Sequence, residues 1–103
     1  MKNNLFQNIP EQSKEEIFTA LFENKDMLIE RIVSFGQVSP EDFWYDQKKD
    51  EWVLVIRGSA EITFSDGETV SLKTGDHLFI PAHKKHRVTR TENKTIWLAI
   101  HLL

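Results

Sequence analysis

Short apolar runs separated by turn residues fill the chain from residue 27 to its end, and this spacing constrains the fold more than any other feature. Runs that recur every ~8–12 residues between turn signals are typical of β-sandwiches and barrels. Asp66 and Gly67 mark one hairpin, because both residue types accept a positive φ. The pattern predicts strands at residues 27–35, 43–47, 51–57, 60–64, 69–72, 77–80, 86–90 and 95–102.

Residues 1–26 have a different pattern from the rest of the chain. Ser13 can cap a helix with Glu16 three residues later, and apolar residues then repeat at helical spacing as far as Leu21. We therefore predict a short helix within an N-terminal extension of residues 1–26, followed by a β-barrel domain at residues 27–103. A chain of 103 residues has material for one hydrophobic core.

Composition excludes several classes of protein. The chain has no cysteine, which rules out disulfides and thiolate metal ligands and suits a reducing compartment, so we expect a cytoplasmic location. The first ten residues lack the apolar run of a signal peptide, and nowhere do ~18 apolar residues follow one another, so no membrane association is predicted. A net charge of −3 argues against nucleic acid as a partner.

Two spacings in the strand-rich part carry a family resemblance. Glu51 is followed by six residues and then Gly58, and Gly75 is followed by five residues and then Pro81, with His86 further on. This order resembles the two motifs of the cupin superfamily, in its small single-domain, bacterial type. The resemblance implies an all-β fold, a double-stranded β-barrel or jelly roll, that commonly assembles as a homodimer.

The chain departs from the cupin pattern at several positions. The family's first motif opens with two histidines, and their places here fall on Tyr45 and Gln47. In the second motif, His83 occupies the position of the second glycine and Arg90 replaces the asparagine. A metal site in this chain would therefore draw some of its ligands from other positions.

Glu51 is a candidate metal ligand because of the residues that share its side of the strand. Residues two apart in a strand point the same way, so Glu51 faces the same side as Val53 and Val55, which we interpret as core residues. A buried carboxylate is costly unless it is paired or bound to a cation. The alternative is a surface carboxylate at the start of the strand.

Three histidines are candidates to share an ion with Glu51. His86 matches the cupin motif directly; if the last two strands form a hairpin about residues 92–94, His101 lies near it, and His83 lies in the turn just before it. His83 could instead be a turn residue with positive φ, and His101 a core or terminal histidine. With an oxygen from Gln47, the candidate metal ligands are Glu51, His83, His86, His101 and Gln47.

The predicted function is that of a small metal-binding cupin. Histidine and carboxylate ligands without sulfur fit several divalent ions; the resemblance favours manganese, with iron, zinc or nickel as alternatives. The metal would keep an open position for a small polar substrate or oxygen, and Tyr45 would be free to donate a hydrogen bond or proton. Whether the protein is an enzyme stays open; if it is, the resemblance implies a metal-dependent oxygenase or isomerase.

Two other functions fit the same residues. The missing histidine pair supports a metal-free module that binds or senses a small, sugar-like molecule. Aromatic side chains such as Trp44 could instead form the interface of an oligomer. The same barrel supports many chemistries, so the fold alone does not choose between these alternatives.

Overall fold

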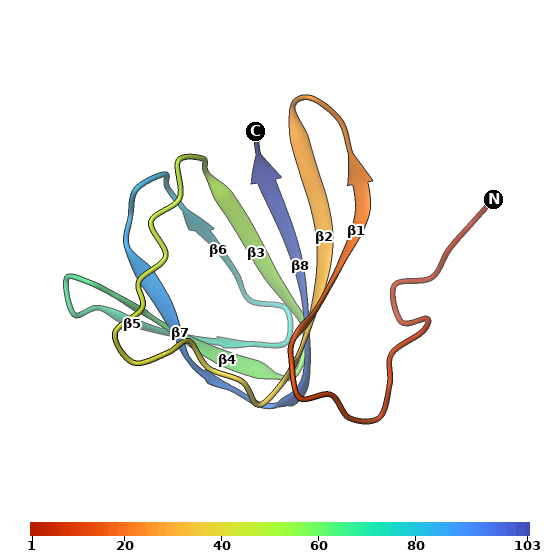
Figure 1. The fold of residues 1–103 in the computed structure, drawn as a ribbon, viewed down its shortest axis with the longest axis horizontal. Helices are drawn as coiled ribbons and strands as arrows, with labels where there is room; N and C mark the ends of the chain where they lie inside the picture. The colour runs from red at the N-terminus through yellow and green to blue at the C-terminus, as the bar shows by residue number, and fades with distance from the viewer.

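The computed structural model describes residues 1–103 and contains eight β-strands and no helix. The strands are β1 (Ile17–Glu23), β2 (Met27–Phe35), β3 (Glu51–Arg57), β4 (Ser59–Phe64), β5 (Thr69–Lys73), β6 (His77–Ile80), β7 (His86–Thr91) and β8 (Asn93–Leu102). They form a five-stranded sheet in the order β1-β2-β8-β3-β6 and a three-stranded sheet in the order β5-β4-β7. Figure 1 shows the two sheets meeting at one end and splaying apart at the other. The predicted all-β, double-stranded barrel is confirmed.

The predicted N-terminal helix is wrong. Its residues form β1, which pairs antiparallel with β2 from Ile17↔Val33 to Glu23↔Leu28. A helix of this length is marginal on its own, whereas the edge of β2 offers a ready row of backbone hydrogen-bond partners. The sheet therefore begins at Ile17, inside the segment expected to be an extension of the barrel. No helix of the structure is long and apolar enough to cross a membrane.

Two further predictions, one of a strand and one of a hairpin, differ from the structure. Residues 43–47 are not a strand; they lie in the long connection between β2 and β3 and make one bridge, between Tyr45 and His86. The last two strands do not form a hairpin with each other, because β7 pairs with β4 while β8 lies between β2 and β3. The chain changes sheets at Glu92, between β7 and β8, and Lys94 just after it has a positive φ of 62°. The last two strands thus belong to different sheets.

The core lies between the inward faces of the two sheets. Burial alternates along β3, so that Glu51, Val53 and Val55 are buried on one side of the strand, as predicted. Side chains from both sheets form one apolar cluster, made of Val53, Val55, Ala60, Ile62, Phe64, Leu72, Ile80, Trp97 and Ala99. Glu51 and His86 begin β3 and β7, and both are buried, with 7% and 5% of their surface exposed. Two titratable groups are therefore held at one end of the core.

Arg31 fastens the N-terminal segment to the outer face of the larger sheet. Its buried guanidinium Nη1 donates to the carbonyl oxygens of Leu5 and Gln7, at 2.8 and 2.7 Å. Hydrogen bonds from a charged donor contribute about 1.5–3 kcal/mol each. Arg31→Met keeps an unbranched apolar chain but removes these donors, so limited proteolysis should cut residues 1–12 about tenfold faster, since ~1.4 kcal/mol is a factor of ten. Exposed Lys73→Met is the control, and unchanged cleavage in Arg31→Met would contradict this role.

The outer edge of the larger sheet is open. β1 has no neighbour on its far side, and Leu21 and Phe22 are exposed on it. An unpaired, apolar edge strand is a common place for a second chain to add. The homodimer expected from the cupin resemblance stays a prediction, and this edge is where we expect it to form.

Candidate functional site

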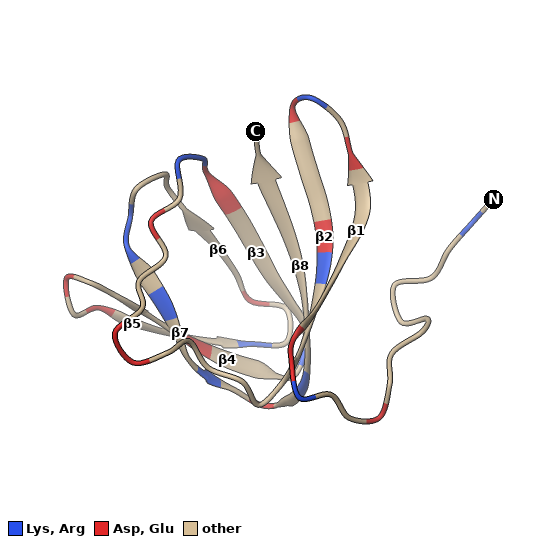
Figure 2. Ribbon diagram, viewed as in Figure 1, with Lys and Arg blue, Asp and Glu red and all other residues tan.

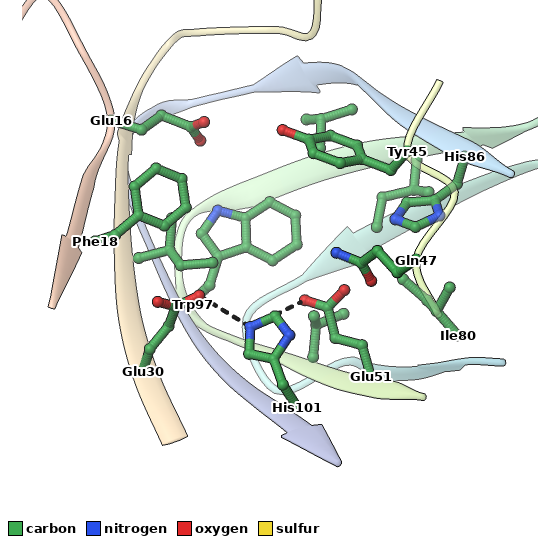
Figure 3. Close-up of a pocket in the computed structure, with 14 residues that line it drawn as sticks. Glu16, Phe18, Glu30, Tyr45, Gln47, Glu51, Ile80, His86, Trp97 and His101 are labelled. Carbon is green, nitrogen blue, oxygen red and sulfur yellow. Dashed lines mark hydrogen bonds and ion pairs between the residues drawn. The ribbon is translucent and has the colours of Figure 1, made fainter. Parts of the chain in front are cut away.

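A pocket of about 200 Å³ lies between the two sheets and draws its walls from both. Its apolar walls are formed mainly by Phe18, Ile32, Val53, Ile62, Ile80, Val88 and Trp97. Its polar side chains are Glu16, Glu30, Tyr45, Gln47, Glu51, His86 and His101. Figure 3 shows these polar groups directed toward one another from opposite sides of the pocket. A pocket that combines apolar walls with convergent polar groups is typical of small-molecule sites.

Most of the predicted site residues meet in this pocket. Four of the five candidate metal ligands line it, namely Gln47, Glu51, His86 and His101, and so does Tyr45. His83 does not line the pocket: its φ is 64°, its side chain is 67% exposed, and Nδ1 lies 2.9 Å from Asp46 Oδ1. This backbone conformation agrees with the alternative interpretation of His83 as a turn residue with positive φ. His77 lies on the outer side, against the ring of Trp52.

Glu51 is the carboxyl group of the pocket whose pKa departs clearly from its ordinary value. Burial raises the pKa of Glu51 above its ordinary value of 4.5, and the nearby carboxylate of Glu30 raises it further. His101, His86 and a hydrogen bond from Gln47 act in the opposite direction, without cancelling the effect of burial. A carboxyl group in such surroundings holds its proton to a higher pH than a free glutamate does, which suits it to proton transfer.

His101 lies between two carboxylates. Its Nε2 is 2.9 Å from Glu30 Oε1 and 3.9 Å from Glu51 Oε2 (Figure 3). The strand order explains this contact, because β8 lies between β2 and β3, where His101 is the direct cross-strand partner of Glu51 and of Leu28. Glu30 is two residues from Leu28 on the same face, within reach of a diagonal contact. These three side chains form an acid–base row along one wall of the pocket.

His86 presents one ring nitrogen to the pocket. Its Nδ1 lies 2.9 Å from the carbonyl oxygen of Lys84, and because a carbonyl only accepts, Nδ1 carries the proton. Nε2 is then the atom left for a ligand. The ring stacks on Tyr45, with centroids 5.5 Å apart and planes at 25°, and the two backbones exchange hydrogen bonds of 2.7 and 3.1 Å. The long connection between β2 and β3 thereby fixes the orientation of His86.

Tyr45 and Glu16 face each other across the pocket (Figure 3). Burial, together with the charges of Glu16 and Glu51, raises the pKa of Tyr45 above its ordinary value of 10.0, so its hydroxyl stays a proton donor. The carboxylate of Glu16 accepts a hydrogen bond from the Ser34 hydroxyl, which in turn accepts one from Trp97 Nε1 at 3.1 Å. Glu16 is therefore held in place rather than free to swing.

Sequence reasoning missed Glu16 and Glu30. Glu16 was expected within the N-terminal helix, whereas in the structure it directly precedes β1 and reaches into the pocket. Glu30 carried a usable signal: it lies among Leu28, Ile29 and Ile32 in an apolar strand, two residues from Ile32, with which it shares the pocket. A lone carboxylate on a buried strand face points to a site for the same reason that applies to Glu51.

The donors of the pocket do not converge as a metal site requires. A first-row divalent ion needs three or four donors around one point. No group of three or more His, Asp or Glu side chains is arranged so that it could hold a metal ion. His101 Nε2 already contacts Glu30, and His83 lies outside the pocket. As they are arranged here, these residues do not fit a resident metal ion.

Comparison with known families decides where this fold and pocket belong. Residues 33–101, more than half of the chain, match the family model of the cupin domain. The chain belongs to the cupin family. The matched residues include all of the sequence-predicted site residues, whereas Glu16 and Glu30 lie outside them. No protein of curated function matches the sequence significantly.

Solved structures agree with this assignment. A provisionally assigned mannose-6-phosphate isomerase from Ralstonia eutropha JMP134 is 45% identical, with a TM-score of 0.94, over 99% of this chain and 97% of its own. A cupin superfamily protein from Desulfitobacterium hafniense DCB-2 is 25% identical, with a TM-score of 0.78, over 92% and 84% of the two chains. A protein from Thermus thermophilus, 18% identical over 98% and 95%, shares the fold with a TM-score of 0.80.

Proposed function

We propose that this cupin binds a small polar molecule between its two sheets and that Glu51 exchanges a proton with it. The observation that carries the proposal is a carboxyl group, 7% exposed, that faces an apolar pocket with two imidazoles beside it. Burial raises the pKa of Glu51 above its ordinary acidic value. Groups tuned in this way serve as acids and bases at physiological pH.

The neighbouring side chains have complementary roles in this proposal. Nε2 of His86 would accept a hydrogen bond from the bound molecule, because Nδ1 already donates to the Lys84 carbonyl. The hydroxyl of Tyr45 would donate one, because it keeps its proton. His101 lies beside Glu51 and can stabilise its ionised form after the proton has moved.

The isomerase assignment of the Ralstonia relative suggests a sugar phosphate, and the pocket argues for a smaller molecule without a phosphate. The cavity of about 200 Å³ is smaller than the ~300–1,000 Å³ typical of ligand pockets, which favours a small molecule. No lysine or arginine lines the pocket to hold a phosphate. Proton transfer, which an isomerase needs, is nevertheless within the capability of Glu51.

A metal-binding cupin is the alternative function for the same pocket. It is favoured by the joint presence of Glu51 and His86, whose Nε2 is left for a ligand. Manganese is the ion we predict in that case, with iron, zinc or nickel as alternatives. The loose arrangement of the donors makes this the second candidate.

Elemental analysis of tag-free protein separates the two functions. We expect the purified protein to hold far less than one equivalent of any transition metal, and Glu51→Ala and His86→Ala to hold no less than the parent. His77→Ala is the matched control, because His77 is exposed on the outer side of β6. Near-stoichiometric manganese or iron that is lost in Glu51→Ala and His86→Ala but kept in His77→Ala would overturn the proposal in favour of the metal site.

A further inference from the structure

We propose that the molecule bound in this pocket is a small alkylammonium ion, an inference that rests on the proposed function. Two features of the pocket support a cation, namely its charge and its aromatic walls. Each feature comes from residues that the strand order and the segment before β1 bring together (Figure 3).

The fixed charges around the pocket are negative. Glu16, Glu30 and Glu51 line it and no lysine or arginine does. Two histidines, His86 and His101, are the basic side chains that face these three carboxyl groups, so acidic groups outnumber basic ones and give the pocket a negative field. In a cavity with low-dielectric walls such a field concentrates cations and repels anions.

The nearest basic residues are turned to other partners. Arg31, between the pocket residues Glu30 and Ile32 on β2, points to the opposite face and donates to the carbonyls of Leu5 and Gln7. The ammonium group of Lys84 lies 4.2 Å from the centroid of the Phe64 ring. Figure 2 shows an acidic residue beside a basic one on β2 and an acidic residue at the start of β3, with further basic residues on the loops and on β7. A cation could therefore enter the pocket without displacing a lysine or an arginine.

Aromatic side chains frame the same space. Figure 3 shows Phe18, Trp97 and Tyr45 around the part of the pocket that lies beneath Glu16. Aromatic faces attract ammonium groups by about 0.5–2 kcal/mol, more when water is excluded, and cages of aromatic rings with carboxylates recognise quaternary ammonium ions. Trp97 is 4% exposed and its Nε1 is held by Ser34, so this wall is rigid. A preorganised aromatic wall favours an apolar cation over a hydrated metal ion.

Three ligands of nearly the same shape test the charge directly. They are choline, its uncharged carbon isostere 3,3-dimethyl-1-butanol, and the anion 3,3-dimethylbutanoate. Binding would be followed by NMR through the indole N–H of Trp97, which lies in the pocket wall, in buffer with a chelator. We expect choline to bind at least tenfold more tightly than the alcohol, and the anion to bind more weakly than either.

Glu16→Gln tests where the charge acts. The substitution keeps the shape of the side chain and an oxygen that can accept from the Ser34 hydroxyl, and it removes one negative charge from the pocket. Choline affinity should fall about tenfold, while the affinity of the alcohol stays unchanged. Glu15→Gln is the matched control, because the Glu15 side chain is exposed one residue away and should affect neither ligand.

The outcomes separate this inference from the function on which it rests. If the alcohol binds as tightly as choline, or if Glu16→Gln leaves choline affinity unchanged, the ligand is not selected by charge and the inference is overturned, while binding of a small polar molecule stands. If none of the three ligands shifts the Trp97 resonance, the inference is overturned as well, while the proposed function, which does not depend on a cationic ligand, is judged by the metal content of the protein.

Discussion

Gly58→Ala is expected to lower the free energy of unfolding by about 2–4 kcal/mol, because it combines backbone strain with a clash. Gly58 joins β3 to β4 with φ at +92°, in the left-handed region that disfavours a side chain. A Cβ there would lie 2.6 Å from Thr95 Oγ1 and 2.9 Å from Thr95 Cα. Thr95 cannot move cheaply, since it is fully buried and its hydroxyl lies 2.7 Å from the Glu92 carbonyl and 3.0 Å from that of Ser59.

Gly67→Ala is the matched control for this substitution. Gly67 has nearly the same conformation, with φ at +96°, but no atom lies within 4 Å of the added Cβ. It should therefore show only the backbone cost, about 1–2 kcal/mol. Urea unfolding monitored by tryptophan fluorescence measures both variants. Equal losses of stability in the two variants would show that the contact with Thr95 does not matter.

Glu51→Gln is expected to make the protein more stable at pH 8, by on the order of 1 kcal/mol, and to flatten the dependence of stability on pH. Burial raises the pKa of Glu51 in the folded protein above 4.5, its ordinary value in the unfolded chain. As pH rises from about 4.5 through the folded-state value, the folded protein holds a proton that the unfolded chain has already released. Stability therefore falls across this window, and the amide removes that fall.

The groups that face Glu51 set the size of this effect. Glu30 repels the ionised carboxylate, whereas His86, His101 and the hydrogen bond from Gln47 partly offset the cost of burial. Unfolding free energies measured from pH 4 to pH 9 should diverge between parent and Glu51→Gln, with the variant increasingly more stable as pH rises. Glu41→Gln, an exposed carboxylate in the connection between β2 and β3, should parallel the parent. A parent that gains stability relative to Glu51→Gln above pH 5 would contradict the argument.

Most of the barrel could be predicted from residue patterns. Alternating burial along β3 and the turn at Asp66 and Gly67 came out as expected, because period-two burial and positive-φ turns are local properties. The helix predicted at residues 17–23 was wrong, because the closely spaced apolar residues of this segment are compatible with a helix and with a strand. Only the free edge of β2 decides between them.

Part of the site was predicted, although the strand pairing used to place one of its residues was wrong. Glu51 and His86 followed from the burial of their strand faces and from the cupin spacing. His101 was placed near His86 through a hairpin that does not exist; it reaches the pocket because β8 lies beside β3 in the other sheet. His83 was predicted as a ligand from its place in the turn just before His86, but its side chain is exposed there.

The sequence by itself determined the class of fold, the turn positions and the buried faces that carry Glu51 and His86. These depend on alternation and on residue conformation, which act over a few neighbouring residues. Only the tertiary structure decided which residues share the pocket. Glu16, Glu30 and His101 arrive there through pairing between distant strands, and the resulting excess of carboxylates, with donors too scattered for a metal, depends on contacts that no local pattern encodes.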